Sequence, residues 1–343
     1  MVTIVLPAHN EEKIIKDSIQ SLLNQSYWDI EIIAVLDNCN DNTEKIINDN
    51  FENNLNIKVF KTVNNKNKKS GALNQLFNYY FDNMGEYILI MDADTVLNKF
   101  AIAEGVKFLN KYYSNGAVCS VAGIMKNKRN LLWYLQNIEY GLSDSSHVEA
   151  QGNIFCCRGM FSMYRKKSLQ QIKNERNYIF DIRSITEDYE LTLALKKYGW
   201  KISSSRKIKA YTDVPLNIKE LYTQRKRWST GGIIDLLKHK VNKYTRNDFL
   251  YLLTYLLISF LQMYLVIDLI QTKFSFNFYF LIFNIAFILI NNLVRIKYIQ
   301  YKNWKVYLIL FTIIPQMLYF YFDMFVFFVS IKNVVFRKKI NWN

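Results

Sequence analysis

The sequence predicts an α/β domain with a mostly parallel sheet, followed by C-terminal transmembrane helices. Residues 1–200 alternate short apolar runs with stretches whose apolar side chains recur at helical spacing, a pattern typical of a sheet covered by helices. Residues 249–343 are dominated by long apolar runs. The net charge of +15 comes entirely from beyond residue 200, because the first 200 residues hold 23 basic and 23 acidic side chains. Basic residues beside apolar runs are typical of membrane proteins.

The composition of the 343 residues excludes several classes of protein. Half of the residues are apolar and 16% are aromatic, which excludes a disordered chain. Four cysteines are too few for a disulfide scaffold and favour reduced thiols in a cytosolic compartment. The neutral charge balance of the first 200 residues argues against nucleic acid as a partner.

Five apolar runs predict buried strands in the first part of the chain. They are Val2–Leu6, Glu31–Leu36, Ile57–Val63, Tyr87–Met91 and Ala117–Ile124. Helical spacing predicts helices over 14–23, 70–80 and 189–198. The Asn-rich tracts at 50–56 and 64–67 are expected to be surface loops.

Three apolar runs, at 249–270, 274–294 and 306–331, are each long enough to cross a membrane. A crossing helix needs about 20 residues for a hydrocarbon core of roughly 30 Å. The basic segment 235–248 precedes them and predicts that the α/β domain, residues 1–234, lies in the cytoplasm, with a transmembrane region over 249–343. Three crossings place the basic C-terminal tail outside, so either the third run is re-entrant around Pro315 or the tail departs from the positive-inside rule.

Acidic side chains follow two of the predicted strands. Asp37 closes EIIAVLD, and Asp92 and Asp94 close YILIMDAD. Ligands of open α/β sheets bind beyond the carboxyl ends of the strands. An Asp-x-Asp there suits Mg²⁺ or Mn²⁺ held together with substrate phosphates, although Asp is also common in loops after strands.

A second acidic cluster, Thr186-Glu187-Asp188, opens a predicted helix. A carboxylate at this place is commonly a helix cap. The alternative is a general base that accepts a proton from an attacking hydroxyl.

The pentapeptide Gln224-Arg225-Lys226-Arg227-Trp228 is basic and carries one aromatic ring. On a helix Gln224, Arg227 and Trp228 share a face. Arg227 and Gln224 suit a pyrophosphate group, and Trp228 suits stacking against a sugar ring. A basic helix lying at a membrane surface is the other interpretation.

These motifs occur together in one order. They are VTIVLPAHNEE near the start, Asp37 in VLDNCNDNT, KSGALN at 69–74, MDAD at 91–94, TED at 186–188 and QRKRW at 224–228. In this combination the sequence resembles the membrane-integrated family 2 glycosyltransferases of the GT-A (Rossmann-like) fold, which include cellulose, chitin, hyaluronan and poly-N-acetylglucosamine synthases. The resemblance covers residues 2–232 closely and the C-terminal helices in general layout.

The resemblance implies a role for each motif residue. Around the donor nucleotide it implies Pro7, His9, Asn10 and Glu11 beside the nucleotide, Asp37 on the uracil, Lys69 near the diphosphate and Asp92 at the donor sugar or ribose. It implies Asp94 as the ligand of Mg²⁺ or Mn²⁺ and Asp188 as the catalytic base of an inverting transfer. Around the pyrophosphate and the acceptor it implies Gln224, Arg227, Trp228, Glu187 and Gly159.

Two departures from the family pattern affect the acceptor. Arg158 is a bulky residue directly before Gly159, in a stretch where the family has small residues. The chain also starts at the first predicted strand, whereas many synthases of this family carry membrane helices before it. The first departure concerns the acceptor subsite, and the second favours a short product or a lipid acceptor.

The expected function is an inverting glycosyltransferase of the plasma membrane, with several crossings. It transfers a sugar from a UDP-sugar to a growing glycan, giving a β-linked polysaccharide or oligosaccharide. The expected partners are the UDP-sugar, a glycan or lipid acceptor and membrane lipids, with no nucleic acid; the oligomeric state stays open. The alternatives are a transferase that adds one sugar to a membrane lipid and a non-catalytic sugar-nucleotide receptor.

Overall fold

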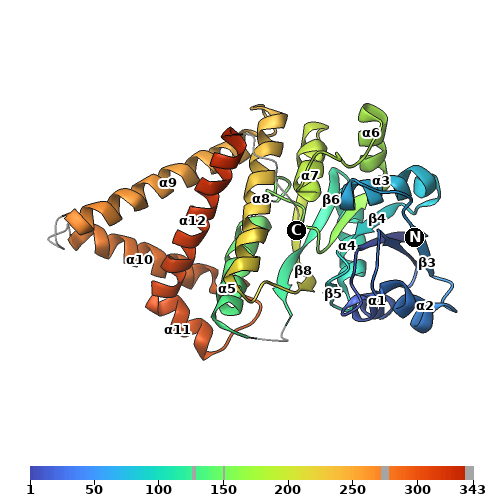
Figure 1. The fold of residues 1–343 in the computed structure, drawn as a ribbon, viewed down its shortest axis with the longest axis horizontal. Helices are drawn as coiled ribbons and strands as arrows, with labels where there is room; N and C mark the ends of the chain where they lie inside the picture. The colour runs from blue at the N-terminus through green and yellow to red at the C-terminus, as the bar shows by residue number, and fades with distance from the viewer. Residues whose placement is uncertain (126–128, 150, 272–277, 337–343) are drawn as a thin grey trace. The chain divides into compact units, whose positions relative to one another are not determined.

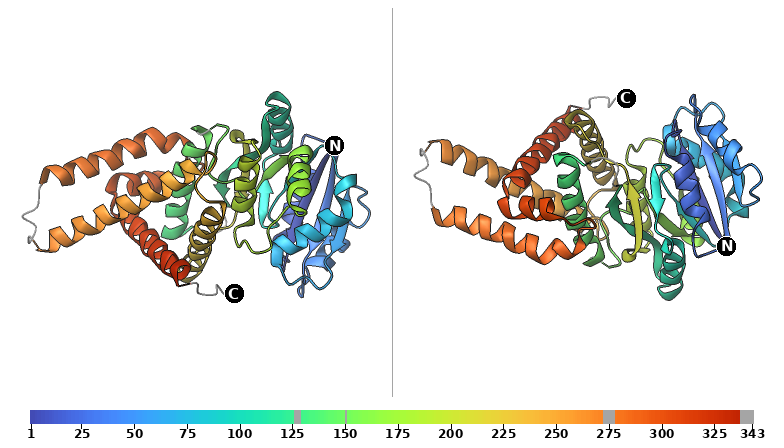
Figure 2. Two further views of the ribbon diagram at one scale, coloured as in Figure 1. Left: turned by 90° about the horizontal axis from the view of Figure 1, so that it is seen from above. Right: turned by 90° about the horizontal axis from the view of Figure 1, so that it is seen from below.

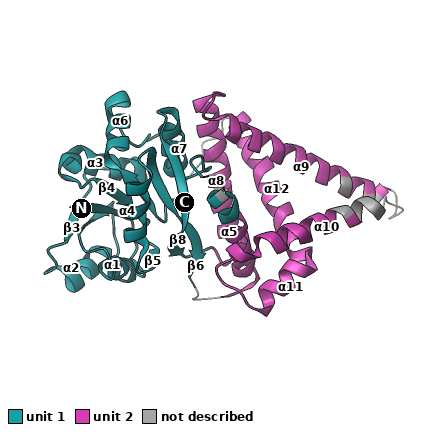
Figure 3. Cartoon of the chain, turned by 180° about the vertical axis from the view of Figure 1, so that it is seen from behind, with its two compact units in different colours: residues 1–127, 143–214 teal, residues 128–142, 215–343 magenta. Residues whose placement is uncertain are grey.

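The computed structural model describes residues 1–125, 129–149, 151–271 and 278–336 (Figure 1). The chain divides into two compact units (Figure 3). Unit 1 comprises residues 1–127 and 143–214, and unit 2 comprises residues 128–142 and 215–343. The helix α8 (Ile218–His239) therefore groups with the C-terminal helices, although the sequence placed the boundary at residue 234.

The described residues of unit 1 form an eight-stranded sheet in the order β3-β2-β1-β4-β7-β6-β8-β5. The strands are β1 (Val2–Ala8), β2 (Ile30–Leu36), β3 (Ile57–Lys61), β4 (Tyr87–Ile90), β5 (Thr95–Leu97), β6 (Asn115–Ile124), β7 (Ser162–Arg165) and β8 (Lys201–Thr212). The first four strands pair in parallel, with Val2 of β1 opposite both Ile30 of β2 and Tyr87 of β4. The strand β7 runs antiparallel between β4 and β6, and β5 runs antiparallel to β8, so the sheet is mixed rather than mostly parallel.

Helices cover both faces of this sheet (Figures 1 and 2). They are α1 (Ile15–Leu23), α2 (Thr43–Phe51), α3 (Lys68–Tyr80), α4 (Ala101–Lys111), α6 (Lys166–Arg176) and α7 (Glu187–Lys197), with the short 3₁₀ helix η1 (Phe81–Asn83) after α3. Apolar side chains of α3, α6 and α7 form one buried cluster with β1, β2 and β4. The helix α1 packs against β5, and α4 packs against β6 and β8. Burial of apolar area in these two layers is the main stabilising term of the domain.

Unit 2 is helical. Its elements are residues 131–142 of α5 (Leu131–Glu149), α8, α9 (Arg246–Gln271), α10 (Phe278–Arg295), η2 (Ile296–Tyr298), α11 (Trp304–Thr312) and α12 (Ile314–Val335). The helix α12 packs along α8, and aromatic pairs such as Tyr255 with Phe327 join it to α9. Within the described part of the chain, two helices, Arg246–Asp268 and Ile314–Val335, are long and apolar enough to cross a membrane, and few of their side chains are buried.

The apolar run 306–331 is divided between two helices. Pro315 has no amide hydrogen to donate to the carbonyl of Phe311, so a continuous helix is interrupted there. Ile313 takes a left-handed φ of 61° between α11 and α12. Of these two helices, α12 has the length of a membrane crossing and α11 does not. Residues 274–277 of the second predicted run lie outside the described residues.

Candidate functional site

The carboxyl ends of the parallel strands β1, β2 and β4 meet at one edge of the unit 1 sheet. The sequence places polar residues directly after each of them: His9, Asn10 and Glu11 after β1, Asp37 after β2, and Asp92 and Asp94 after β4. Pro7 lies inside β1, opposite Val35 of β2. This edge is where an open α/β sheet binds its ligand, as the sequence predicted.

Asp37 is buried and held in one orientation. Its Oδ1 accepts hydrogen bonds from Thr62 Oγ1 at 2.8 Å, Asn65 Nδ2 at 2.8 Å and Asn38 Nδ2 at 3.1 Å. The ring Nδ1 of His9 lies 2.6 Å from the carbonyl oxygen of Asp37, which joins the turns after β1 and β2. Asn65 is 9% exposed, so it is part of this site rather than of a surface loop.

The turn after β1 brings Glu11 toward the acids that follow β4. Asn10 adopts a left-handed φ of 60°, and its Oδ1 accepts from the Asn40 amide at 2.9 Å. Burial, together with the negative charges of Asp94 and Asp92, raises the pKa of Glu11 to about 7. Carboxylates gathered in this way favour a bound cation.

Lys69, in the first turn of α3, bridges two acids. Its Nζ lies 2.5 Å from Asp92 Oδ1 and 2.7 Å from Glu187 Oε1. Burial lowers the pKa of Lys69, but the two carboxylates outweigh this and hold the pKa above its usual value. The ammonium group is therefore charged at physiological pH and joins the β4 turn to α7.

Gly159 connects the same two segments through its backbone. Its carbonyl accepts from the Asp92 amide at 3.0 Å, and its own amide donates to Asp188 Oδ2 at 3.3 Å. A Cβ atom at this position would lie 2.5 Å from Asp92 Oδ2, so a side chain here requires a shift of Asp92. Lys69, Gly159, Glu187 and Asp188 line one small pocket.

Asp188 is the second residue of α7 and is partly exposed. The N-cap position belongs to Thr186, and Asp188 lies in the first turn of the helix. Its Oδ1 accepts from the Tyr189 amide at 2.8 Å. Burial and the negative charge of the neighbouring Glu187 raise the pKa of Asp188, Lys69 opposes both, and the net pKa is about 6. A carboxylate with this pKa is ionised at neutral pH and suited to general-base work.

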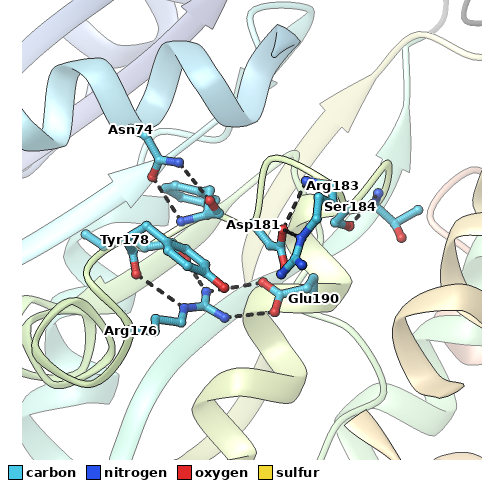
Figure 4. Close-up of polar contacts among 10 residues, drawn as sticks. Asn74, Arg176, Tyr178, Asp181, Arg183, Ser184 and Glu190 are labelled. Carbon is cyan, nitrogen blue, oxygen red and sulfur yellow. Dashed lines mark hydrogen bonds and ion pairs between the residues drawn. The ribbon is translucent and has the colours of Figure 1, made fainter. Parts of the chain in front are cut away.

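The segment that leads into α7 is fixed by side chains from α3 and α6 (Figure 4). Asn74 of α3 donates from Nδ2 to the Phe180 carbonyl at 2.7 Å and accepts the Phe180 amide on Oδ1 at 3.0 Å. Arg176 at the end of α6 pairs with the buried Glu190 of α7 at 2.8 Å. The backbone before Asp188 is thus tied to two neighbouring helices.

Asp94 is the candidate metal ligand. Burial and the charge of Asp92 raise its pKa to about 6 against the opposing charge of Lys69, and Thr95 Oγ1 donates to its Oδ1 at 3.3 Å. Among the described residues no group of three or more His, Cys, Asp or Glu side chains has the arrangement of a complete metal site. This donor set fits a hard cation that takes one or two carboxylates and completes its coordination with substrate phosphates.

The other predicted residues, Gln224, Arg227 and Trp228, lie in unit 2. They share one face of α8, and the Trp228 side chain is exposed. Their neighbour Arg225 had no predicted role. It is buried, and its Nη2 lies 2.5 Å from Glu139 Oε2 of α5 and 3.1 Å from the Tyr319 hydroxyl of α12. The contact of Gln224, Arg227 and Trp228 with pyrophosphate or acceptor stays a prediction.

Sequence reasoning missed four side chains around the unit 1 site: Thr62, Asn65, Asn74 and Arg158. Asn74 belongs to the KSGALN motif, so the motif itself could have pointed to it. Thr62 and Asn65 had no such signal, because they reach Asp37 from 25 and 28 residues away along the chain. Arg158 was noted only as a departure from the family pattern.

Comparison with known proteins identifies relatives of this chain. Residues 3–173 match the family model described as Glycosyl transferase family 2. A poly-β-1,6-N-acetyl-D-glucosamine synthase of Staphylococcus epidermidis is 30% identical over 240 residues, which cover 69% of this chain and 56% of that protein. A synthase of the same name from Staphylococcus aureus strain COL is 29% identical over 273 residues, covering 78% of this chain and 63% of that protein. The chain therefore matches less than two thirds of the length of these relatives.

Two solved structures share the fold. A mannosyltransferase from Pyrobaculum calidifontis in complex with GDP-mannose and Mn²⁺ has a TM-score of 0.65 at 15% identity, covering 98% of this chain and 88% of that one. Residues 1–349 of Staphylococcus aureus TarS in complex with UDP-GlcNAc give a TM-score of 0.51 at 14% identity, covering 100% of this chain and 93% of that one. At these identities the likeness concerns the fold alone, and it confirms the predicted GT-A class.

Proposed function

Because this chain belongs to glycosyltransferase family 2, we propose that it transfers a sugar from a UDP-sugar to the hydroxyl group of a growing glycan, with inversion at the anomeric carbon. The observation that carries the proposal is the Asp188 carboxylate. It lies in one pocket with Lys69, and Gly159 links it to Asp92. A single base that removes a proton from an acceptor is what a direct, inverting displacement needs.

We propose UDP-N-acetylglucosamine as the donor and a β-linked glycan as the product. Support comes from the two staphylococcal relatives, whose names describe synthases of poly-β-1,6-N-acetyl-D-glucosamine. In this proposal Asp37 accepts a hydrogen bond from the uracil N–H, since Thr62 and Asn65 already hold its carboxylate in place. Pro7, His9, Asn10 and Glu11 border the nucleotide at the end of β1.

In the proposed reaction Asp188 takes the proton of the acceptor hydroxyl as its oxygen attacks the anomeric carbon. The bond between that carbon and the phosphate oxygen breaks, and UDP leaves with the electron pair. Lys69 offers positive charge near the diphosphate, and Asp92 orients the donor sugar or ribose. A fixed cation beside a developing negative charge stabilises the transition state.

A divalent cation, Mg²⁺ or Mn²⁺, completes the proposed donor site. Asp94 would hold it together with oxygens of the diphosphate, in keeping with the carboxylates gathered near Glu11. When bound, the cation neutralises charge on the leaving group. The pyrophosphate and the acceptor end are assigned to Gln224, Arg227 and Trp228 of α8, with Glu187 and Gly159 beside the base.

We propose that unit 1 works on the cytoplasmic side of the plasma membrane, to which the apolar helices of unit 2 anchor it. The basic residues around α9 support this orientation.

Membranes containing the protein should be offered a panel of UDP-sugars, and UDP release should be measured for each. Product masses then separate the hypotheses: a ladder of sizes supports glycan extension, and one adduct on a lipid supports single addition. Failure of every donor to release UDP, in the presence of primer and cation, favours the receptor alternative.

A further inference from the structure

We propose that Arg158 is a positioning residue for the catalytic carboxylate. Its buried ion pair with Asp144 fixes the turn 157–162, so that the peptide between Arg158 and Gly159 presents its N–H group to Asp188. This inference rests on the proposed role of Asp188 as the base. It concerns unit 1 alone, to which all of these residues belong.

The Arg158 side chain points away from solvent into a polar cluster on α5. Its Nη1 pairs with Asp144, and its Nη2 donates to Ser143 Oγ at 2.8 Å. The Asp144 side chain is 1% exposed and the Arg158 side chain 17% exposed. The Asp144 oxygens also accept from the Ala122 amide of β6, at 3.0 and 3.2 Å. The guanidinium is therefore attached to a rigid strand and helix rather than to mobile surface groups.

The charges of the cluster centre on one ion pair. His147 Nδ1 lies 3.3 Å from Arg158 Nη2, and burial and the Arg158 charge lower the pKa of His147 to about 3, with a smaller effect of the buried Lys196 in the same direction. The imidazole is thus neutral at physiological pH, and the negative charge of Asp144 faces the positive charge of Arg158. Such a pair is costly to break on one side only, because the remaining charge stays buried.

The peptide that follows Arg158 is held on both of its sides. The Arg158 carbonyl accepts from Ser162 Oγ at 2.7 Å and from the Phe161 amide at 3.3 Å. The amide of the same peptide plane donates to Asp188 Oδ2, and the next carbonyl, of Gly159, accepts from the Asp92 amide. A displacement of Arg158 therefore moves the adjoining residue Gly159, whose amide contacts Asp188 and whose carbonyl contacts Asp92.

This arrangement also explains the bulky residue that the sequence analysis found beside Gly159. The Arg158 side chain is directed to α5 and the Gly159 position has no side chain, so neither fills the pocket beside Lys69 and Asp188. Arg158 acts through the turn, and the acceptor hydroxyl meets Asp188.

The test compares a charge-neutral double variant with the wild type in the membrane-embedded full chain. Arg158→Gln with Asp144→Asn removes both charges together and leaves no unpaired buried ion. We expect turnover to fall by about 10²-fold, as expected for a misplaced catalytic group, while the KM for UDP-N-acetylglucosamine changes by less than about twofold. Lys58→Gln with Glu31→Gln, an ion pair near the opposite edge of the sheet, is the matched control and should keep wild-type turnover.

A conservative variant gives a second readout that does not depend on the double variant folding. Arg158→Lys keeps the charge opposite Asp144 but loses the fork that also reaches Ser143, so turnover should fall about tenfold with KM unchanged. Wild-type turnover in either Arg158 variant, or a loss of turnover matched by an equal rise in KM, overturns the proposal. Asp188→Asn is measured beside them: if that variant keeps wild-type turnover, the proposed base is wrong, whereas an inactive Asp188→Asn with fully active Arg158 variants refutes the positioning role alone.

Discussion

At the scale of single residues, the candidate site is a row of charged side chains, three carboxylates around one ammonium group. Asp92, Lys69 and Glu187 follow one another at 2.5 and 2.7 Å, and Asp188 lies beside Glu187 in the sequence. The single ammonium partly offsets three carboxylates. Burial and the uncompensated negative charge then raise the pKa of Asp188. A raised carboxylate pKa beside a pocket is what the proposed base requires.

Asp188→Asn tests the base directly. The amide keeps the shape of the side chain but cannot take up a proton, so we expect turnover to fall by at least about a hundredfold with nearly unchanged UDP-sugar affinity. Turnover and affinity should be measured on the same preparation. Asp17→Asn, on the exposed face of α1, is the matched control. Near-wild-type turnover of Asp188→Asn would rule out the base.

The pH profile of turnover should report the same carboxylate. The active form is ionised, so protonation at a pKa of about 6 removes it, and turnover at saturating donor and cation should decline as the pH falls through about 6. Above that pH the rate should reach a plateau until another group titrates. A flat profile between pH 5 and 8 contradicts the assignment.

Asp94→Asn tests the cation site. Loss of one anionic ligand should weaken the apparent affinity for Mg²⁺ or Mn²⁺ and remove most turnover without lowering the thermal stability. The wild type should lose its activity in excess EDTA and regain it when either cation is restored. Isothermal titration of the cation in the presence of UDP gives a readout that does not depend on turnover. Full activity in excess chelator would refute the metal role.

At the scale of secondary-structure elements, α7 is held in place by an ion pair with the end of α6. The Glu190 side chain is 2% exposed and that of Arg176 14% exposed, so both charges lie away from water (Figure 4). Glu190 lies two positions after Asp188, less than one helical turn away. A shift of α7 therefore moves the proposed base.

Arg176→Met should destabilise unit 1 by roughly 3–5 kcal/mol, because it leaves the Glu190 carboxylate buried without its partner. Adding Glu190→Leu should restore most of that stability, since the double variant buries two apolar side chains and no unpaired charge. Lys58→Met, in an exposed pair with Glu31, should cost about 0–1 kcal/mol as the control. Chemical denaturation checks all three, and an equal loss in the single and double variants contradicts the argument.

The elements that sequence analysis found, and those it missed, differ in their hydrophobic pattern. The strands β1, β2, β4 and β6 are apolar on both faces and stand out as continuous runs. The strand β8 reads KISSSRKIKAYT, in which Ser, Lys and Arg interrupt any alternation. The strand β7 has four residues and lies between two apolar strands. The strands β7 and β8 form because they pair with neighbouring strands, and no local sequence pattern records that pairing. The antiparallel pairs of β7 and of β5 with β8 make the sheet mixed.

The site followed the same division. Residues at strand ends, such as Asp37 and Asp94, were predictable because topology alone brings strand ends together. The partners that orient Asp37 were not, because Asn65 lies in a segment that reads as an Asn-rich loop and Thr62 near the end of a predicted strand. Arg158 finds Asp144 across 14 residues and a turn, and no spacing rule predicts that contact.

At the scale of the whole molecule, charge and hydropathy separate along the chain. Residues 1–200 carry no net charge, and the excess of basic residues lies in the last 143 residues, many of them beside apolar helices. The helix α9 begins at Arg246, soon after Lys238, Lys240 and Lys243. Basic residues at the end of a crossing helix favour the cytoplasmic side.

The last prediction concerns this orientation. The helix α9 has 26 residues and is about 39 Å long at 1.5 Å per residue, which is long enough for its two ends to reach opposite faces of a membrane. Cys119 and Cys157 are buried and cannot report on sidedness, so single reactive cysteines are introduced instead, in a background with the partly exposed Cys39 and Cys156 replaced by Ser. Leu55→Cys, at a position 97% exposed in unit 1, should react with an impermeant maleimide only after the membrane is opened. Gln271→Cys, at the far end of α9, should react in sealed cells. Labelling of Leu55→Cys in sealed cells would reverse the orientation, and protection of both cysteines until lysis would show that α9 does not cross.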